Sequence, residues 1–212
     1  MMSDLDPIRH DIVTICHHLY QRGLIAGTEG NVSVRVGADR VCITPSGCHK
    51  GFLDPSDLLL IDLDGKVCVG SGQPSSETPM HVMLYRRRAD VHAVVHAHPP
   101  IATALTVAGY DLVTTLLPET VVALGEVPTV PYEMPTTWAF AETVSQAMQH
   151  AAAALLANHG GVAVGPSLQA AFNTMETVER AAQIFFLARA MGQVRSLPPA
   201  ALEALSALRQ GG

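Results

Sequence analysis

Residues 91–100 read VHAVVHAHPP, a run of mostly β-branched and apolar residues that ends in two prolines. This pattern predicts a buried strand, because proline has no amide proton to extend a strand ladder. Side chains alternate between the faces of a strand, so His96 and His98 point the same way, with Cα atoms about 6.6 Å apart. Two imidazoles can therefore reach one metal ion. His92 has the same parity but lies roughly 13 Å from His96 along the strand, outside such a site.

A third histidine occupies a predicted turn between two later strands. Asn158-His159-Gly160 separates the apolar runs 154–157 and 161–164. With His96 and His98, His159 would supply the three protein ligands that catalytic zinc sites typically use. The alternative is structural, with two polar residues at a strand end and a solvated histidine in a loop. The local spacing leaves both interpretations open.

Length and composition favour one domain spanning residues 1–212, since nothing resembling a linker divides the chain. Hydrophobic residues make up 48% and charged residues 15%, which predicts a large core and an oligomer. The net charge of -6 argues against general binding to nucleic acid or anionic membranes. No apolar run approaches the roughly 20 residues of a membrane span. The four cysteines form no C-x-x-C pair and no secretory signal is visible, so we expect a cytoplasmic protein with no membrane partner.

The remaining pattern alternates hairpins with amphipathic helices. Strands are predicted at residues 32–36 and 41–43 and, across Asp64-Gly65, at 58–63 and 67–69. Helices are predicted at residues 6–22, 74–88, 101–107, 137–150 and 167–191, and after Pro199. Residues 110–135 give no clear pattern. The sequence therefore predicts an α/β layered sandwich with a mixed, largely antiparallel central sheet flanked by helices, not a doubly wound parallel sheet.

Three short stretches combine small residues with hydroxyl or amide donors: Gly30-Asn31, Ser46-Gly47 and Ser75-Ser76. The last precedes a predicted helix, where free backbone N–H groups and the helix dipole favour an anion. Together they could hold a phosphate, although each alone is an ordinary turn or cap. Glu77 follows directly, either as a first-turn acid that the dipole stabilises or as a catalytic carboxylate.

Five segments in order resemble the class II aldolase/adducin superfamily, in particular the fuculose-phosphate aldolase group. They are GTEGNVSVR (27–35), ITPSG (43–47), PSSE (74–77), HAVVHAHP (92–99) and LANHG (156–160). The resemblance covers residues from about 8 to 192, nearly the whole chain. On these motifs the chain is identified as a member of the superfamily.

The resemblance implies a metal-dependent site. His96, His98 and His159 would bind a divalent metal, usually Zn²⁺, with Mn²⁺ or Co²⁺ as alternatives. Glu77 would act as acid/base and ligate the metal when substrate is absent. The positions that hold the substrate phosphate in the family correspond here to Gly30, Asn31, Ser46, Gly47, Ser75 and Ser76.

The resemblance also implies an assembly. The family's catalytic tyrosine reaches the site from a neighbouring subunit and is expected to correspond to Tyr132, which predicts a homotetramer with interfacial active sites. One residue departs from the motif: Glu29 stands where a small residue is commoner. A carboxylate beside a phosphate loop must point away, or the anion is held differently.

The implied activity is that of a class II, zinc-dependent aldehyde-lyase. It would cleave a ketose 1-phosphate, such as L-fuculose, 5-deoxyribulose or 5-methylthioribulose 1-phosphate, to dihydroxyacetone phosphate and an aldehyde. The metal would stabilise the enediolate that forms. A 3-oxo-tetronate 4-phosphate decarboxylase is the main alternative. Pentulose-phosphate 4-epimerases tend to carry Asp at the position of Glu77, and the related dehydratases lack the Ser-Ser-Glu pattern.

Two other classes fit less well. A non-catalytic scaffold resembling the adducin head domain would be expected to lose the ligand set, whereas the three histidines and Glu77 are all present. A zinc hydrolase could also use His-x-His, but Pro99-Pro100 replaces the Asp-His continuation of many such sites.

Overall fold

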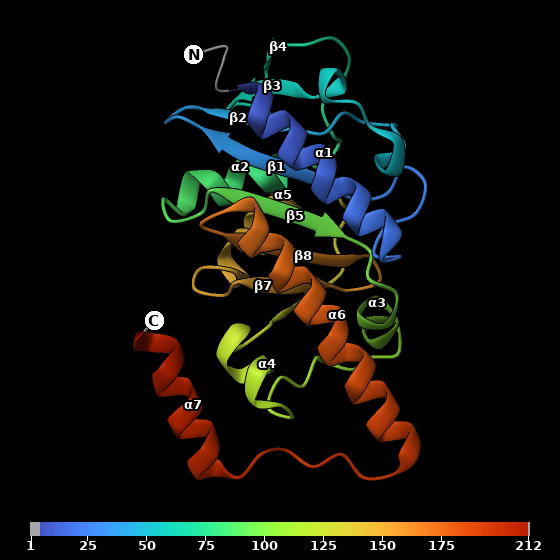
Figure 1. Ribbon diagram of the computed structural model, residues 1–212, viewed down its shortest axis with the longest axis vertical. Helices are drawn as coiled ribbons and strands as arrows, with labels where there is room; N and C mark the ends of the chain where they lie inside the picture. Colours follow the sequence, from blue (N-terminus) through green and yellow to red (C-terminus); the bar gives the residue numbers. More distant parts are fainter. Residues whose placement is uncertain (1–4, 212) are drawn as a thin grey trace.

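The computed structural model describes residues 5–211 and places one eight-stranded sheet between two layers of helices (Figure 1). The strand order is β4-β3-β2-β1-β5-β8-β7-β6. Every pair of neighbouring strands is antiparallel except the β6–β7 pair, which is parallel. The mixed, largely antiparallel sheet predicted from the hairpins is therefore confirmed. The strands are β1 Asn31–Val36, β2 Arg40–Ile43, β3 Leu59–Asp62, β4 Val67–Val69, β5 Ala93–Ala97, β6 Thr129–Val130, β7 Ala153–Leu156 and β8 Gly160–Gly165.

Helices cover both faces of the sheet. One face packs against α1, α3 and α6, and the other against α2 and α5, as Figure 1 shows in part. Helix α7 lies against α4 at the end of the molecule away from β4. The helices are α1 Leu5–Gln21, α2 Thr78–Arg87, α3 Pro100–Val107, α4 Pro118–Ala123, α5 Trp138–Ala147, α6 Leu168–Met191 and α7 Pro199–Gly211, with 3-10 turns η1 Lys50–Phe52 and η2 Pro55–Asp57.

Strand β5 has neighbours on both sides and helices over both faces, so its residues are all buried. Val94 belongs to the core under α2 and α5, whereas Val95 belongs to the core under α1 and α6. An internal strand covered on both faces needs apolar residues at every position, which explains the continuous apolar run. His96 has the parity of Val94 and therefore points toward the α2 and α5 side.

Most predicted elements are present, with small shifts at their ends. Thr137 and Ser167 cap α5 and α6 by accepting the backbone N–H groups of Phe140 and Ala170. Helix α2 begins at Thr78, after a turn in which the Thr78 N–H donates to the Ser75 carbonyl, and Pro74 forms a β-bridge with Pro45. The unassigned residues 110–135 contain α4 and the two-residue strand β6, both too short to give a periodic pattern. Within residues 5–211, no helix has the combined length and apolar character of a membrane-spanning segment.

Candidate metal centre and anion cavity

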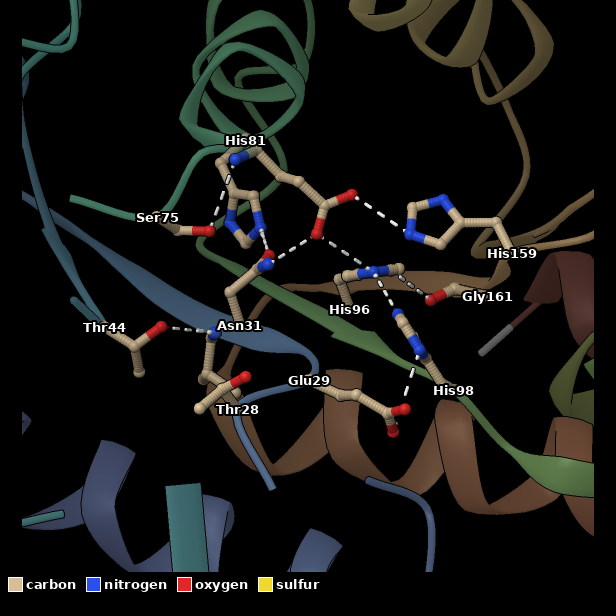
Figure 2. Close-up of polar contacts among 12 residues, drawn as sticks. Thr28, Glu29, Asn31, Thr44, Ser75, His81, His96, His98, His159 and Gly161 are labelled. Atoms are coloured by element: carbon tan, nitrogen blue, oxygen red, sulfur yellow. Dashed lines mark hydrogen bonds and ion pairs between the residues drawn. The ribbon is translucent and has the colours of Figure 1, made fainter. Parts of the chain in front are cut away.

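Three histidines from distant parts of the chain converge at the end of β5. His96 lies within the strand and is fully buried, and His98 follows one residue after the strand ends. His159 lies in the turn between β7 and β8, where its N–H donates to the Leu156 carbonyl at 3.0 Å. One ring nitrogen from each histidine lies within 4.8 Å of the others, as Figure 2 shows. The predicted grouping of the three imidazoles is thus present in the fold.

A glycine lets the β7–β8 turn approach β5. In the register of β5 with β8, Ala97 pairs with Gly161. A Cβ atom on Gly160 would lie 2.4 Å from the Ala97 carbonyl oxygen and 2.9 Å from Cδ2 of His98. Any side chain at residue 160 would therefore push His159 away from the other two histidines.

Glu77 stands at the N-cap of α2 and faces the histidines. Its Oε2 lies 3.1 Å from Nε2 of His96, and its Oε1 lies 3.4 Å from Nε2 of His159. The side-chain amide of Asn31 donates to Oε2 at 2.7 Å. Burial alone would raise the pKa of Glu77, but His96, His159 and the Asn31 hydrogen bond together hold that pKa well below its usual range. Glu77 is therefore a carboxylate at neutral pH.

The donor set suits a cation. Nδ1 of His96 lies 2.9 Å from the Gly161 carbonyl, an acceptor, so Nδ1 carries the proton of the neutral ring. When His96 is neutral, as metal binding requires, its Nε2 turns a lone pair toward the Glu77 carboxylate and toward Nε2 of His98, which is 3.1 Å away. Oε1 of Glu77 is buried without a hydrogen-bond partner among the described residues. Lone pairs converging on one point repel each other unless a positive charge lies between them, and three imidazoles with a carboxylate suit a divalent metal such as Zn²⁺.

Protonation states support this arrangement. Burial, with the positive field of His96, lowers the pKa of His98 to about 3. Burial and His96 likewise lower the pKa of His159 to about 4. Burial also acts to lower the pKa of His96, but the Glu77 carboxylate outweighs it, so that pKa is raised above its ordinary value. Two of the imidazoles are thus neutral at physiological pH and ready to coordinate.

Glu29, the residue that departs from the family motif, turns toward the metal centre. Its carboxylate accepts the Ala26 N–H at 3.0 Å and lies 3.8 Å from Nδ1 of His98, the ring nitrogen opposite the one that faces His96 (Figure 2). A carboxylate behind a ligating histidine orients the ring and raises its basicity. At 3.8 Å the Glu29 carboxylate is near the His98 ring but beyond hydrogen-bond distance, and its hydrogen-bond partner is the Ala26 N–H.

A chain of hydrogen bonds continues from Glu77 into the core. Asn31 donates its amide N–H to the carboxylate, so its Oδ1 must accept from Nε2 of His81. Nδ1 of His81 is then an acceptor for the Ser33 hydroxyl, which is 2.6 Å away and in turn bonds to Tyr85. Burial lowers the pKa of His81 to about 3, consistent with a neutral ring. His81 was not predicted to belong to the site, although its position one helical turn after Glu77 was a usable signal.

All six residues predicted to hold phosphate line one small cavity beside the histidines. Its volume is about 110 Å³, and Glu77 and His98 form part of its wall. Two backbone bonds bring the turns together, from Ser46 N–H to the Gln73 carbonyl and from Ser75 N–H to the Thr44 carbonyl. The other lining residues are Thr28, Glu29, Gly30, Asn31, Pro45, Gly47, Lys50 and Ser76.

Glycine is required at one position of this cavity. Gly30 has a φ of +67°, and a Cβ there would lie 2.8 Å from the His96 carbonyl oxygen.

Tyr132 does not line the cavity. It follows β6, and its side chain is 59% exposed. Lys50 does line it and was not predicted, because a lysine in a turn is ordinarily solvated.

Comparison with known proteins places this site in a family. Residues 10–186 match the model of the class II aldolase and adducin N-terminal domain. The chain belongs to the class II aldolase/adducin family. It is 34% identical over 206 residues to the 5-deoxy-D-ribulose 1-phosphate aldolase of Bacillus thuringiensis serovar kurstaki, covering 96% of this chain and 95% of that protein.

Other members of the class II aldolase/adducin family have different activities. The 3-oxo-tetronate 4-phosphate decarboxylase of Escherichia coli (strain K12) is 36% identical over 184 residues, covering 85% of this chain and 86% of that protein. A solved L-fuculose 1-phosphate aldolase superposes with a TM-score of 0.88 at 32% identity, covering 95% of each chain. Membership implies a metal-dependent enzyme that acts on a sugar phosphate, and the exact reaction differs among relatives.

Proposed function

We propose that this protein is a metal-dependent aldehyde-lyase that cleaves a ketose 1-phosphate to dihydroxyacetone phosphate and an aldehyde. The observation that carries the proposal is the shared cavity: Glu77 and His98 line the same 110 Å³ space as Ser46 and Ser75. A substrate whose phosphate lies against the serine turns would place its carbonyl end at the histidines. The B. thuringiensis relative, named for 5-deoxy-D-ribulose 1-phosphate cleavage, supports this reaction class.

The proposed step conserves atoms and charge. The C3–C4 bond breaks, its electron pair moves toward the C2 carbonyl, and the C4 hydroxyl gives its proton to the Glu77 carboxylate as the aldehyde forms. A divalent ion held by His96, His98 and His159 would supply Lewis-acid stabilisation for the negative charge that develops on the substrate. Glu77 then returns a proton to C3 as the general acid. Tyr132 of a neighbouring subunit is proposed to complete the site in a homotetramer.

A second reaction is a specific rival. The E. coli decarboxylase is as similar to this chain as the aldolases are, and decarboxylation of a 3-oxo acid also leaves negative charge beside a carbonyl. The same metal, Glu77 and phosphate-binding residues would serve it. The two reactions differ in the group that leaves, an aldehyde or carbon dioxide, and so they are separable by their products.

The test is a product assay on the metal-loaded protein. L-fuculose, 5-deoxyribulose and 5-methylthioribulose 1-phosphates and a 3-oxo-tetronate 4-phosphate are incubated separately, and triose phosphate and carbon dioxide are measured. We expect triose phosphate from at least one ketose phosphate, with modest preference among them because an apolar pocket discriminates by only about 1–3 kcal/mol per methylene. Carbon dioxide from the oxo acid, with no triose phosphate from any ketose, would replace the aldolase proposal with the decarboxylase.

A further inference from the structure

Lys50 is a buried ammonium in the wall of the anion cavity. It begins η1, three residues after Gly47, and is 2% exposed. Its Nζ donates to the carbonyl oxygens of Thr28 at 3.1 Å and Cys48 at 2.7 Å. An ammonium has three N–H donors, so two carbonyl acceptors leave one donor free to bind a further acceptor.

This ammonium has no counter-ion in the part of the chain that the structure describes. No carboxylate among residues 5–211 pairs with Lys50. The Cys16 thiol is close enough to interact, but burial raises the pKa of that thiol to about 12, so it is neutral. Glu77 is already paired with His96 and Asn31. A buried charge without a partner is costly, and burial accordingly lowers the pKa of Lys50.

The cavity itself needs this charge to hold an anion. Its serine hydroxyls and the Asn31 amide are neutral donors, whereas Glu29 and Glu77 place two carboxylates in the wall. Among the lining residues, Lys50 alone carries an ammonium or guanidinium group. A phosphate dianion entering without Lys50 would meet the Glu29 carboxylate with no ammonium or guanidinium group beside it in the wall.

We infer that Lys50 is the counter-ion of the substrate's phosphate group. The phosphate accepts the third N–H donor of Lys50, and the buried ammonium gains the negative partner that the chain does not supply. The inference rests on the proposed function only in taking the substrate to be a phosphate monoester. It holds equally for a ketose phosphate and for a phosphorylated oxo acid, because both carry this group.

The chain offers a matched pair of variants, since Lys50 and the exposed Lys66 are its two lysines. Inorganic phosphate is titrated into the metal-loaded wild type, Lys50→Met, Lys50→Arg and Lys66→Met by calorimetry. Loss of a charged hydrogen bond should weaken phosphate binding roughly 10- to 100-fold in Lys50→Met, with partial recovery in Lys50→Arg. Lys66→Met should bind like the wild type. Binding by Lys50→Met within about twofold of the wild type would overturn the inference, because a lost charged bond costs at least about tenfold.

If Lys50→Met does not fold, nuclear magnetic resonance of the wild type tests whether Lys50 contacts bound phosphate. With isotope-labelled lysine, the side-chain signals of Lys50 should shift on phosphate addition and saturate with the calorimetric dissociation constant, while those of Lys66 stay in place. Lys50 signals that do not move at saturating phosphate would refute the assignment.

These results are separable from the proposed reaction. If the wild type binds phosphate through Lys50 but cleaves no ketose phosphate, the lyase proposal fails and the Lys50 inference stands. If the wild type is an active lyase and Lys50→Met has an unchanged KM for substrate, the Lys50 inference fails and the lyase proposal stands. A rise in KM larger than the fall in kcat is the expected pattern, because phosphate contacts persist through the reaction.

Discussion

His159 is the ligand whose contribution is easiest to isolate, because it sits in a turn and its loss leaves the strand ladder intact. We expect His159→Ala to lose bound divalent metal, since two imidazoles and a carboxylate bind such an ion more weakly than three imidazoles do. The measurement is metal content by elemental analysis after dialysis, with circular dichroism to show that the fold remains. Full metal retention in His159→Ala would show that His159 is not a metal ligand.

Substitution of Glu77 should lower kcat without changing the metal content of the protein. Glu77→Gln keeps the shape of the side chain and can still accept from Asn31, but it cannot return a proton to carbon. A general acid typically contributes roughly 10²- to 10⁴-fold, so kcat should fall by that factor. Metal content, measured in parallel, should stay at the wild-type value. Near-normal turnover would make Glu77 a structural residue at the start of α2.

Metal binding should release few protons at neutral pH. The pKa values of about 4 for His159 and about 3 for His98 mean that both rings are already deprotonated. Only His96, whose pKa is raised, has a proton to lose. We therefore expect release of at most about one proton per metal ion, and affinity that weakens as pH falls through the pKa of His96. Calorimetry in buffers of different ionisation enthalpy measures this number, and a value of two or more would contradict it.

At the scale of elements, α2 and β1 are joined by a buried polar chain. His81 and Tyr85 on α2 bond to Asn31 and Ser33 on β1, and that chain ends on the Glu77 carboxylate. The orientation of each donor follows from its neighbour, so the chain fixes the direction in which the Asn31 amide points. Loss of a hydrogen bond in the middle of this chain should therefore change the orientation of the Glu77 carboxylate.

The variant His81→Phe tests this coupling. It leaves Oδ1 of Asn31 without its partner and the Ser33 hydroxyl bonded to Tyr85 alone, and an unsatisfied buried group costs about 1–3 kcal/mol of stability. We expect lower unfolding stability in urea together with a lower kcat, while metal content stays the same. Tyr85→Phe is the matched control, because it removes only the last hydroxyl of the chain and should change kcat little. Equal losses of kcat in both variants would indicate a packing effect instead.

At the scale of the whole molecule, the position of Tyr132 leads to a prediction about assembly. Its exposed side chain does not line the cavity of its own chain, so a catalytic role requires a second subunit. Tyr132→Phe and His98→Ala should each be inactive alone. Mixed subunits should regain activity, because some sites then combine an intact metal centre with an intact tyrosine. Refolded mixtures are assayed against each parent.

The control for this experiment is a mixture of His98→Ala with His159→Ala. Both ligands come from one chain, so no mixed assembly contains an intact metal centre and no activity should return. A fully active monomer, detected by sedimentation at assay concentration, would contradict the role assigned to Tyr132.

Several parts of this architecture were predictable because their causes are local. Turns such as Asp64-Gly65 predict the hairpins, and Thr137 and Ser167 predict where two helices begin. The continuous apolar run predicts the buried strand β5. The common direction of His96 and His98 follows from strand alternation alone. By contrast, α4 and β6 were not predicted, because elements of two to six residues carry no periodic signal and depend on what they pack against.

The sequence by itself determined the fold class, α/β, and the chemical groups that a site could use. These groups are a His-x-His pair on a strand, turns rich in hydrogen-bond donors, and a carboxylate after two serines. Only the tertiary structure decided which of them meet. His159 reaches β5 because β8 pairs beside it and Gly160 lets the turn approach, and Lys50 becomes a buried cation because the 27–30 and 46–50 turns close around it. Spacing along a chain fixes directions within one element, whereas contact between elements depends on sheet register and close packing, which no local pattern records.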